Sequence, residues 1–141
     1  MKRLLALLVS LPLALTTQSA LAERIAIIAG EQAPVSNLTL TEAQQLFSGQ
    51  LRSVDGHAVE ALDMPGNDTL RNSFYQQLLG RSADQMRAHW ARLIFTGKAK
   101  PPREVAHSDE MRNLVTRNSN MIGYLPADKV PANAKVLLII N

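Results

Sequence analysis

The stretch of this sequence with the clearest potential for chemistry is the start of one predicted helix. A Pro-Gly turn is followed by Asn67, Asp68 and Thr69, each of which can accept a hydrogen bond from a free amide of the first helical turn. Free amides and the positive end of the helix dipole together favour an anion at such a position. The pattern therefore predicts an anion site at this helix start.

A cation, Arg71, lies in the first turn of the same helix, where positive charge is ordinarily unfavourable. One interpretation is a weak surface ion pair between Asp68 and Arg71 across one helical turn. The other is that a bound anion offsets the charge of Arg71. A basic loop further along the chain, with Lys98, Lys100 and Arg103, either supplies more charge to that anion or is a solvated connection. The residues alone leave these alternatives open.

The sequence offers little support for catalysis or metal binding. His57, His89 and His107 lie far apart, in no spacing that suits a metal on one helix or turn. Ser73 falls within a predicted helix and has no neighbouring base. The chain has no cysteine, which excludes thiol catalysis and cysteine-ligated metals. We therefore predict a protein that is not an enzyme and that has neither a metal site nor a cofactor.

The N-terminus carries the pattern of a secretory signal peptide. Two basic residues precede an apolar block over Leu4–Leu15, and a small-x-small motif ends at Ala22. The block is too short to be a permanent membrane anchor. We expect residues 1–22 to be a signal peptide cleaved after Ala22, and residues 23–141 to form one periplasmic domain.

The charge balance argues against nucleic acid as a partner. Without Lys2 and Arg3, the 15 basic residues fall to 13, against 12 acidic residues. Nucleic-acid binding usually needs a clear basic excess on one face. The exported domain is therefore expected to bind no nucleic acid.

Apolar patterning predicts alternating strands and helices along the domain. A buried strand over Arg24–Ala29 precedes a short helix, for which Thr41 and Gln44 form a capping box. Residues 51–63 are predicted to form a hairpin or extended pair that turns at Asp55-Gly56, a strong hairpin signal.

Two helices should follow, over Thr69–Leu79 and over Ala83–Phe95, the second opening with a Ser82–Gln85 capping box. The second helix has an apolar stripe predicted to face the core, made of Met86, Trp90, Leu93 and Ile94. Its other face carries Arg87, His89 and Arg92.

The last part of the domain continues the alternation. Thr96–Glu104 is predicted to be a loop, and Ser108 to cap another helix. Strands are expected over Met121–Leu125 and over Lys135–Ile140, the latter covered on both faces because it is continuously apolar. Together these elements predict an α/β fold with a central mixed or mostly parallel sheet flanked by helices.

The order of several short motifs resembles that of the periplasmic phosphate-binding proteins of ABC transporters. The motifs are Phe47-Ser48-Gly49 after the first helix, Gly66-Asn67-Asp68-Thr69 followed by Phe74, a helix with Trp90, and Val115–Asn120 leading into Ile122-Gly123-Tyr124. They cover about residues 41–128, which is most of the expected domain.

This resemblance implies the fold of a type II solute-binding protein, in a short form with one lobe rather than two. It places the phosphate loop of the family on Gly66, Asn67, Asp68 and Thr69. A family arginine that grips the phosphate aligns with Asp63, so the resemblance points to Arg71 and Lys98 as the replacement cations.

Two functional hypotheses follow. The first is a non-enzymatic solute-binding-like protein that holds a small anion such as phosphate, associated with ABC-type uptake or sensing through a membrane transporter or receptor. One lobe would leave the ligand partly wetted, so the hypothesis includes a homodimer or a partner protein that covers it. The alternative is an envelope interaction or sensory module whose ligand site has degenerated.

Overall fold

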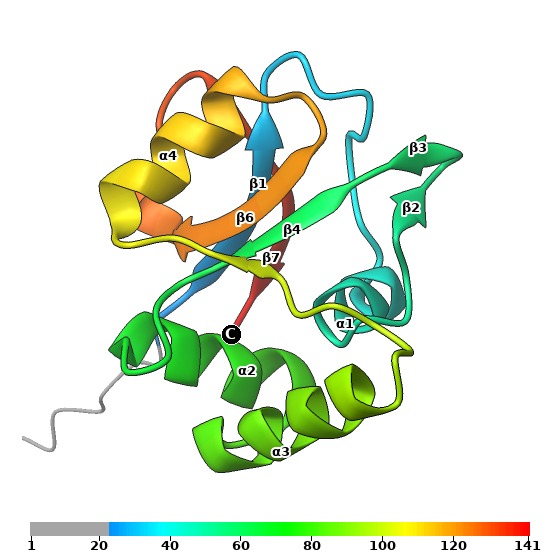
Figure 1. Cartoon of the computed structure of the whole chain (residues 1–141). Coiled ribbons are helices and arrows are strands. Elements are labelled where there is room, and N and C mark those ends of the chain that lie inside the picture. The colour runs from blue at the N-terminus through cyan, green and yellow to red at the C-terminus, as the bar shows by residue number, and fades with distance from the viewer. Residues whose placement is uncertain (1–22) are drawn as a thin grey trace, which may run out of the picture.

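A computed structural model describes residues 23–141 (Figure 1). The predicted signal peptide lies outside the described residues. A five-stranded sheet runs in the order β5-β4-β6-β1-β7. β4 pairs in parallel with β5 and β6, and β1 pairs antiparallel with β6 and β7, so the sheet is mixed as expected. Its strands are β1 (Ile25–Gly30), β4 (Glu60–Asp63), β5 (Arg103–Glu104), β6 (Met121–Pro126) and β7 (Ala134–Ile140).

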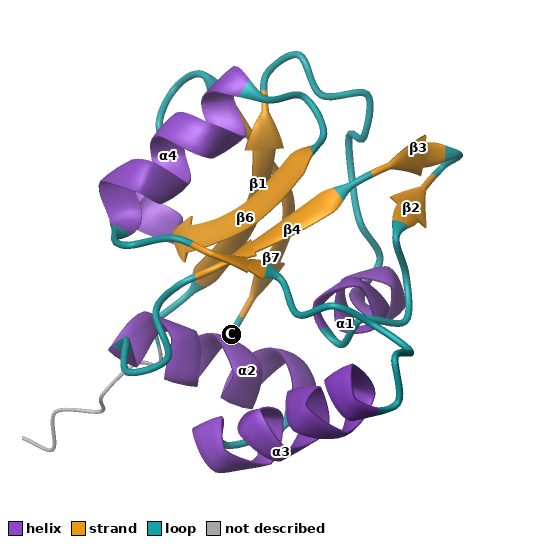
Figure 2. Ribbon diagram, in the orientation of Figure 1, coloured by secondary structure: helices purple, strands orange, loops and turns teal. Residues whose placement is uncertain are grey.

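Helices flank this sheet, as Figure 2 shows. They are α1 (Leu40–Phe47), α2 (Thr69–Leu79), α3 (Ala83–Phe95), α4 (Ser108–Arg117) and the short 3-10 helix η1 (Ala127–Lys129). The predicted hairpin is confirmed at Asp55-Gly56, between β2 (Ser53–Val54) and β3 (His57–Ala58). The bounds of α2 and α3, and the Ser82–Gln85 capping box, are also confirmed.

Helix α4 packs so closely on the sheet that two strand positions have no room for a side chain. A Cβ atom at Gly123 of β6 would lie 2.3 Å from Met111 Sδ, and one at Gly30 of β1 would lie 2.6 Å from the carbonyl oxygen of Val115. Glycine permits such a close approach of backbone and helix. Because side chains alternate across a strand, the neighbours of Gly123 in β6 point to the opposite face of the sheet.

Aromatic side chains fill that opposite face. The rings of Phe74 from α2 and Tyr124 from β6 stack with centroids 3.7 Å apart. Phe47 from α1 meets Phe74 edge-on, with centroids 4.8 Å apart. All three residues are fully buried. This packing fixes α2 against the sheet and holds the Tyr124 ring beside the end of β4.

Three local predictions about caps and strands are wrong. Helix α1 is capped by Thr39, whose hydroxyl accepts from the amide of Glu42, and not by Thr41. The sequence contains two overlapping capping-box patterns, and the earlier one starts the helix. His107 rather than Ser108 caps α4, because its Nδ1 accepts from the amide of Glu110. Within the predicted loop 96–104, the short strand β5 pairs with β4.

The last strand, β7, is not covered on both faces. It pairs only with β1 and so forms an edge of the sheet, and Val136 is 42% exposed. A continuous apolar run does not show that both faces of a strand are covered, because an edge strand can carry apolar residues that are only half buried.

Candidate anion site

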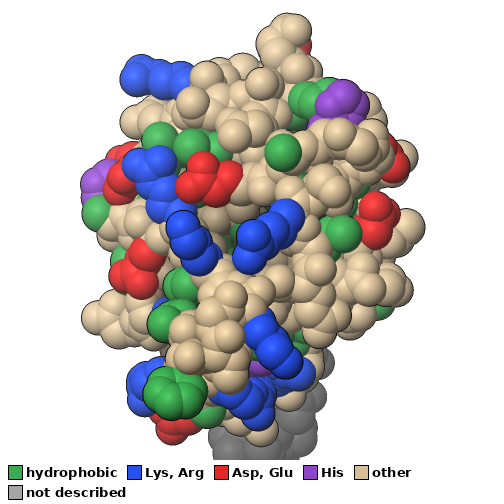
Figure 3. Space-filling view, turned by 45° about the vertical axis from the view of Figure 1, so that its right-hand side comes forward, with side chains coloured by type: hydrophobic (Ala, Val, Ile, Leu, Met, Phe, Trp, Pro, Cys, Tyr) green, Lys and Arg blue, Asp and Glu red, His purple; other side chains and the backbone are tan. Residues whose placement is uncertain are grey.

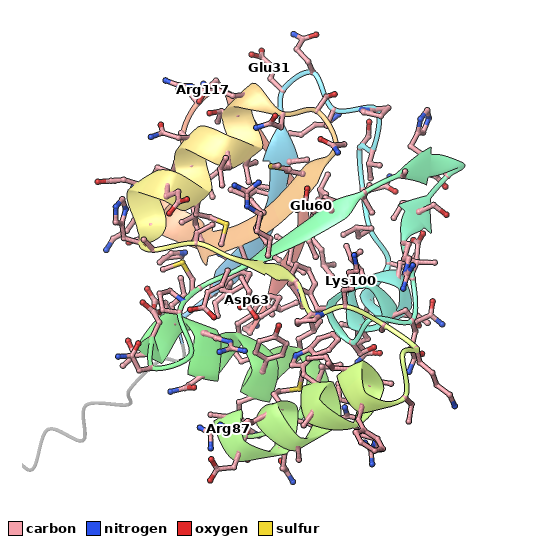
Figure 4. All side chains as sticks on the ribbon, in the orientation of Figure 1. Glu31, Glu60, Asp63, Arg87, Lys100 and Arg117 are labelled. Carbon is pink, nitrogen blue, oxygen red and sulfur yellow. The ribbon has the colours of Figure 1, made fainter. Side chains whose placement is uncertain are left out.

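Asp63, the last residue of β4, is the centre of a buried polar cluster. It is 3% exposed and lies between the sheet and α2 (Figure 4). Its Oδ2 accepts from the hydroxyl of Tyr75 at 2.6 Å and from Nε of Arg71 at 3.1 Å. Its Oδ1 accepts from the amide of Met64 at 2.9 Å and from the hydroxyl of Tyr124. Each carboxylate oxygen thus has two donors. We call these five residues the Asp63 cluster.

Burial raises the pKa values of the three acidic side chains in the Asp63 cluster. Burial raises the pKa of the Asp63 carboxyl above its usual value, although the charge of Arg71 and the bonds from the two tyrosines and the Met64 amide act in the opposite direction. Burial and the neighbouring Asp63 charge raise the pKa of both Tyr75 and Tyr124 well above the ordinary tyrosine value. The two hydroxyls are therefore held as donors to Asp63.

Arg71 pairs with Asp63 and not with Asp68. The interpretation of a surface pair between Asp68 and Arg71 is wrong, because the partner lies at the end of the preceding strand and is buried. The side chain of Arg71 is 19% exposed, and its Cζ lies 5.6 Å from the centroid of the Tyr75 ring. A cation is stable in the first turn of α2 because this carboxylate lies beside it.

Asp68 is the N-cap of α2. Its Oδ1 accepts from the amides of Leu70 at 2.8 Å and of Arg71 at 3.3 Å. These are two of the amides that an anion at the helix start would use. The chain therefore supplies its own carboxylate to the start of the helix.

Five of the six predicted site residues line one or the other of two surface pockets near the α2 start. Gly66, Asn67 and Arg71 line the first, which has a volume of about 470 Å³ and lies between this turn and α3. We call it the α2–α3 pocket. Its remaining lining residues are Ala83, Arg87, Trp90, Ala91, Ile94 and Pro101.

Asp68 and Thr69 line the second, the α2–α4 pocket, where the starts of α2 and α4 meet. Its charged lining residues are Glu23, Asp68, Asp109, Arg112 and Lys129. Arg112 is already paired with Asp109. Three carboxylates against two cations disfavour an anion there. The α2–α3 pocket, in contrast, is lined by two arginines and by no acidic residue.

The basic loop reaches the α2–α3 pocket only in part. Pro101 lines it, and also lines a neighbouring pocket together with Lys100 and Arg103. Lys98 is exposed and lines neither the α2–α3 nor the α2–α4 pocket. Lys and Arg side chains gather across the middle and lower part of the face drawn in Figure 3.

Sequence reasoning missed Arg87 and Trp90 as pocket residues because it assigned them to opposite faces of α3. In the structure Ala83, Arg87, Trp90, Ala91 and Ile94 form one lining stripe. Their spacing of three and four residues was the available signal. Met86 and Trp90 of the predicted core-facing stripe are buried and Leu93 packs against the core, as predicted, but Ile94 is 56% exposed and His89 is buried in its place.

The prediction that His89 lies on the outer face is also wrong. The residue is 8% exposed, and its Nε2 lies 2.8 Å from the carbonyl oxygen of Ser48. Its Nδ1 faces Arg81 Nη1 at 3.3 Å. Because arginine can only donate, Nδ1 accepts and Nε2 donates. His89 thus ties α3 to the end of α1.

Comparisons with known proteins identify the fold. No protein-family model matches the sequence, and no curated protein matches it. Among solved structures, an ABC-type phosphate transport receptor from Vibrio cholerae is similar with a TM-score of 0.63 and 19% identity, over 82% of this chain and 45% of that chain. A second similar structure is assigned to a phosphate ABC transporter substrate-binding protein with bound phosphate, from Clostridium perfringens. Its TM-score is 0.63 and its sequence identity is 18%, over 82% of this chain and 45% of that chain.

At this level of identity the similarity establishes the fold. The chain has a phosphate-binding-protein-like α/β fold in a partial, single-lobe form, and it spans less than half the length of the two solved chains. Within residues 23–141, no helix is long and apolar enough to cross a membrane. The same residues contain no group of three or more histidine, aspartate or glutamate side chains placed to hold a metal ion.

Proposed function

We propose that this chain is a non-enzymatic, solute-binding-like protein of the periplasm that holds a small anion such as phosphate. It would deliver or report that anion to a membrane transporter or receptor of the ABC type. The fold supports this class of function, as do its two structural neighbours, which are a phosphate transport receptor and a phosphate transporter substrate-binding protein. The proposed ligand site is the α2–α3 pocket, with Asn67, Arg71 and Arg87 as its polar residues.

One observation carries the proposal: two arginines line a pocket that no acidic residue lines. Arg71 uses Nε for Asp63, and its partly exposed side chain also lines the pocket. Among residues 23–141, the only ion pair of Arg87 is an exposed one with Asp84, at 2.9 Å. Planar guanidinium groups match phosphate and carboxylate geometry. A small anion between them would replace solvent and not an internal partner.

Thermal unfolding in the presence of inorganic phosphate tests the proposal. Phosphate at about 100 times its dissociation constant should stabilise the domain by about 2.7 kcal/mol, a rise of several degrees in Tm. Arg87→Ala should remove most of that rise. The matched control is Arg92→Ala on the same helix, because Arg92 does not line the α2–α3 pocket and should leave the rise unchanged.

A panel of phosphate, sulfate and small carboxylates that leaves Tm unchanged would overturn the proposal. In that case the alternative, an envelope interaction module, would gain support from the end of α3, where Ile94 is 56% and Phe95 92% exposed. Two adjacent large apolar side chains that protrude from a helix end are typical of a surface that meets another protein.

A further inference from the structure

We infer that the ligand of the α2–α3 pocket is an organic anion, in which a phosphate or carboxylate group is joined to an aromatic or branched apolar body. This inference rests on the proposed function and specifies the class of its ligand. Inorganic phosphate would use only the polar residues that line the pocket.

The residues that line the α2–α3 pocket are of two chemical kinds. Asn67, Arg71 and Arg87 supply amide and guanidinium donors, whereas Trp90, Ala91, Ile94 and Pro101 supply apolar surface. A volume of about 470 Å³ falls in the range of small-molecule sites. An inorganic anion has no apolar surface to place against the second group of residues. A ligand with a charged head and an apolar body uses both.

Trp90 contributes the largest side chain to the lining of the pocket. It is 6% exposed, and its indole Nε1 is buried with no hydrogen-bond partner among the described residues. Because that atom is closed off from solvent, a ligand in the pocket would contact the apolar part of Trp90 and not its N–H. Trp90 therefore favours an apolar group on the ligand.

Gly49 and His89 pack against the indole of Trp90 and fix its position. A Cβ atom at Gly49 would lie 2.9 Å from Trp90 Cζ3, so the far edge of the ring rests directly on the backbone after α1. His89 packs edge-on against the same ring, with centroids 5.0 Å apart. Trp90 is therefore a rigid wall of the pocket, which suits a planar or branched apolar group.

The charge and the apolar body of the ligand can be tested separately by titration calorimetry. We compare inorganic phosphate with phenyl phosphate, and acetate with benzoate, and we follow the emission of Trp90, the only tryptophan of the chain. Phenyl phosphate should bind roughly tenfold or more tightly than phosphate, because the ring buries apolar surface. Benzoate should exceed acetate by a similar factor, and both aromatic ligands should change the Trp90 emission.

Two neighbouring residues give matched variants. Ile94→Ala removes apolar surface from the pocket and should weaken phenyl phosphate several-fold more than it weakens inorganic phosphate. Phe95→Ala removes a side chain that does not line the pocket and should change neither. A preference for phenyl phosphate that Ile94→Ala lowers and Phe95→Ala does not would support the inference.

The remaining outcomes separate the two proposals. Equal affinity for phosphate and phenyl phosphate would overturn the organic ligand and leave the anion site standing. An aromatic preference that Ile94→Ala leaves intact would also overturn it, because the apolar body would then lie elsewhere. Binding of none of the four ligands would overturn both proposals.

Discussion

The two regions that meet at Arg71 differ in how completely their polar groups are satisfied. In the Asp63 cluster, each oxygen of one carboxylate has two donors, and Tyr75 and Tyr124 are nearly or fully buried. In the adjacent α2–α3 pocket, Arg87 pairs, among the described residues, only with the exposed Asp84.

The difference shows how one arginine can serve both stability and binding. Nε of Arg71 neutralises an internal carboxylate, while the exposed part of its side chain borders solvent. A bound anion would therefore not compete for Nε. The bond to Asp63 orients the Arg71 guanidinium, and the part of the side chain that borders the pocket stays accessible to a ligand. Each of the following predictions tests whether the two regions are in fact separate.

The largest effect should follow from Asp63→Ala. This change leaves two buried hydroxyls and the Arg71 guanidinium without their acceptor, while the Met64 amide keeps only the Tyr124 hydroxyl at 3.2 Å. Removing one partner of a buried ion pair typically costs about 3–5 kcal/mol. Urea unfolding should show that loss in the free energy of unfolding.

The matched control is Asp84→Ala, which removes the other carboxylate that pairs with an arginine at this site. Asp84 is 87% exposed, so its loss should change stability by less than about 1 kcal/mol. If Asp63→Ala were as mild as Asp84→Ala, the Asp63 cluster would not be the closed structural unit described above.

The two tyrosines of the cluster predict a steep loss of stability in alkali. The pKa of each is raised in the folded state, so folding retains protons that the unfolded chain releases near pH 10. The stabilisation is fully present below about pH 10 and falls as the pH rises further, by about 1.4 kcal/mol per pH unit for each tyrosine.

Tyrosinate absorbance measures this directly, because Tyr75 and Tyr124 are the only tyrosines of the chain. In the native protein the absorbance should rise only together with the loss of far-ultraviolet circular dichroism. In urea it should rise near the ordinary pKa of about 10. Ionisation at the ordinary pKa in a protein that stays folded would contradict the cluster.

Periodicity and turn chemistry predicted most of the fold because these signals are local. The bounds of α2 and α3 and the hairpin at Asp55-Gly56 depend on spacings of a few residues, and they were confirmed. The exposure of β7 depends on its place in the sheet, and its apolar run carries no information about that. Likewise, the inner position of His89 depends on a carbonyl 41 residues earlier.

The sequence indicated the kind of partner that Arg71 needs but not which residue supplies it. The unfavourable place of Arg71 in the first turn of α2 correctly indicated a negative partner. That partner, Asp63, could not be identified, because its bonds to Tyr75 and Tyr124 join α2 and β6 at separations of 12 and 61 residues. In the resemblance to phosphate-binding proteins, Ile122-Gly123-Tyr124 now has a physical account: Gly123 admits α4 and Tyr124 binds Asp63.

The smallest effect on stability, and the sharpest test of the comparison, should come from Arg87→Ala. Arg71 and Arg87 line the same pocket, but the side chain of Arg87 is 76% exposed and has lost little water to its pair with Asp84. Its removal should change the free energy of unfolding by no more than about 0.5 kcal/mol in urea. Arg71→Ala should cost several times more, because it leaves Asp63 buried without its counter-charge. Equal losses in the two variants would mean that Arg87 is structural as well, and the open pocket would then be part of the closed cluster.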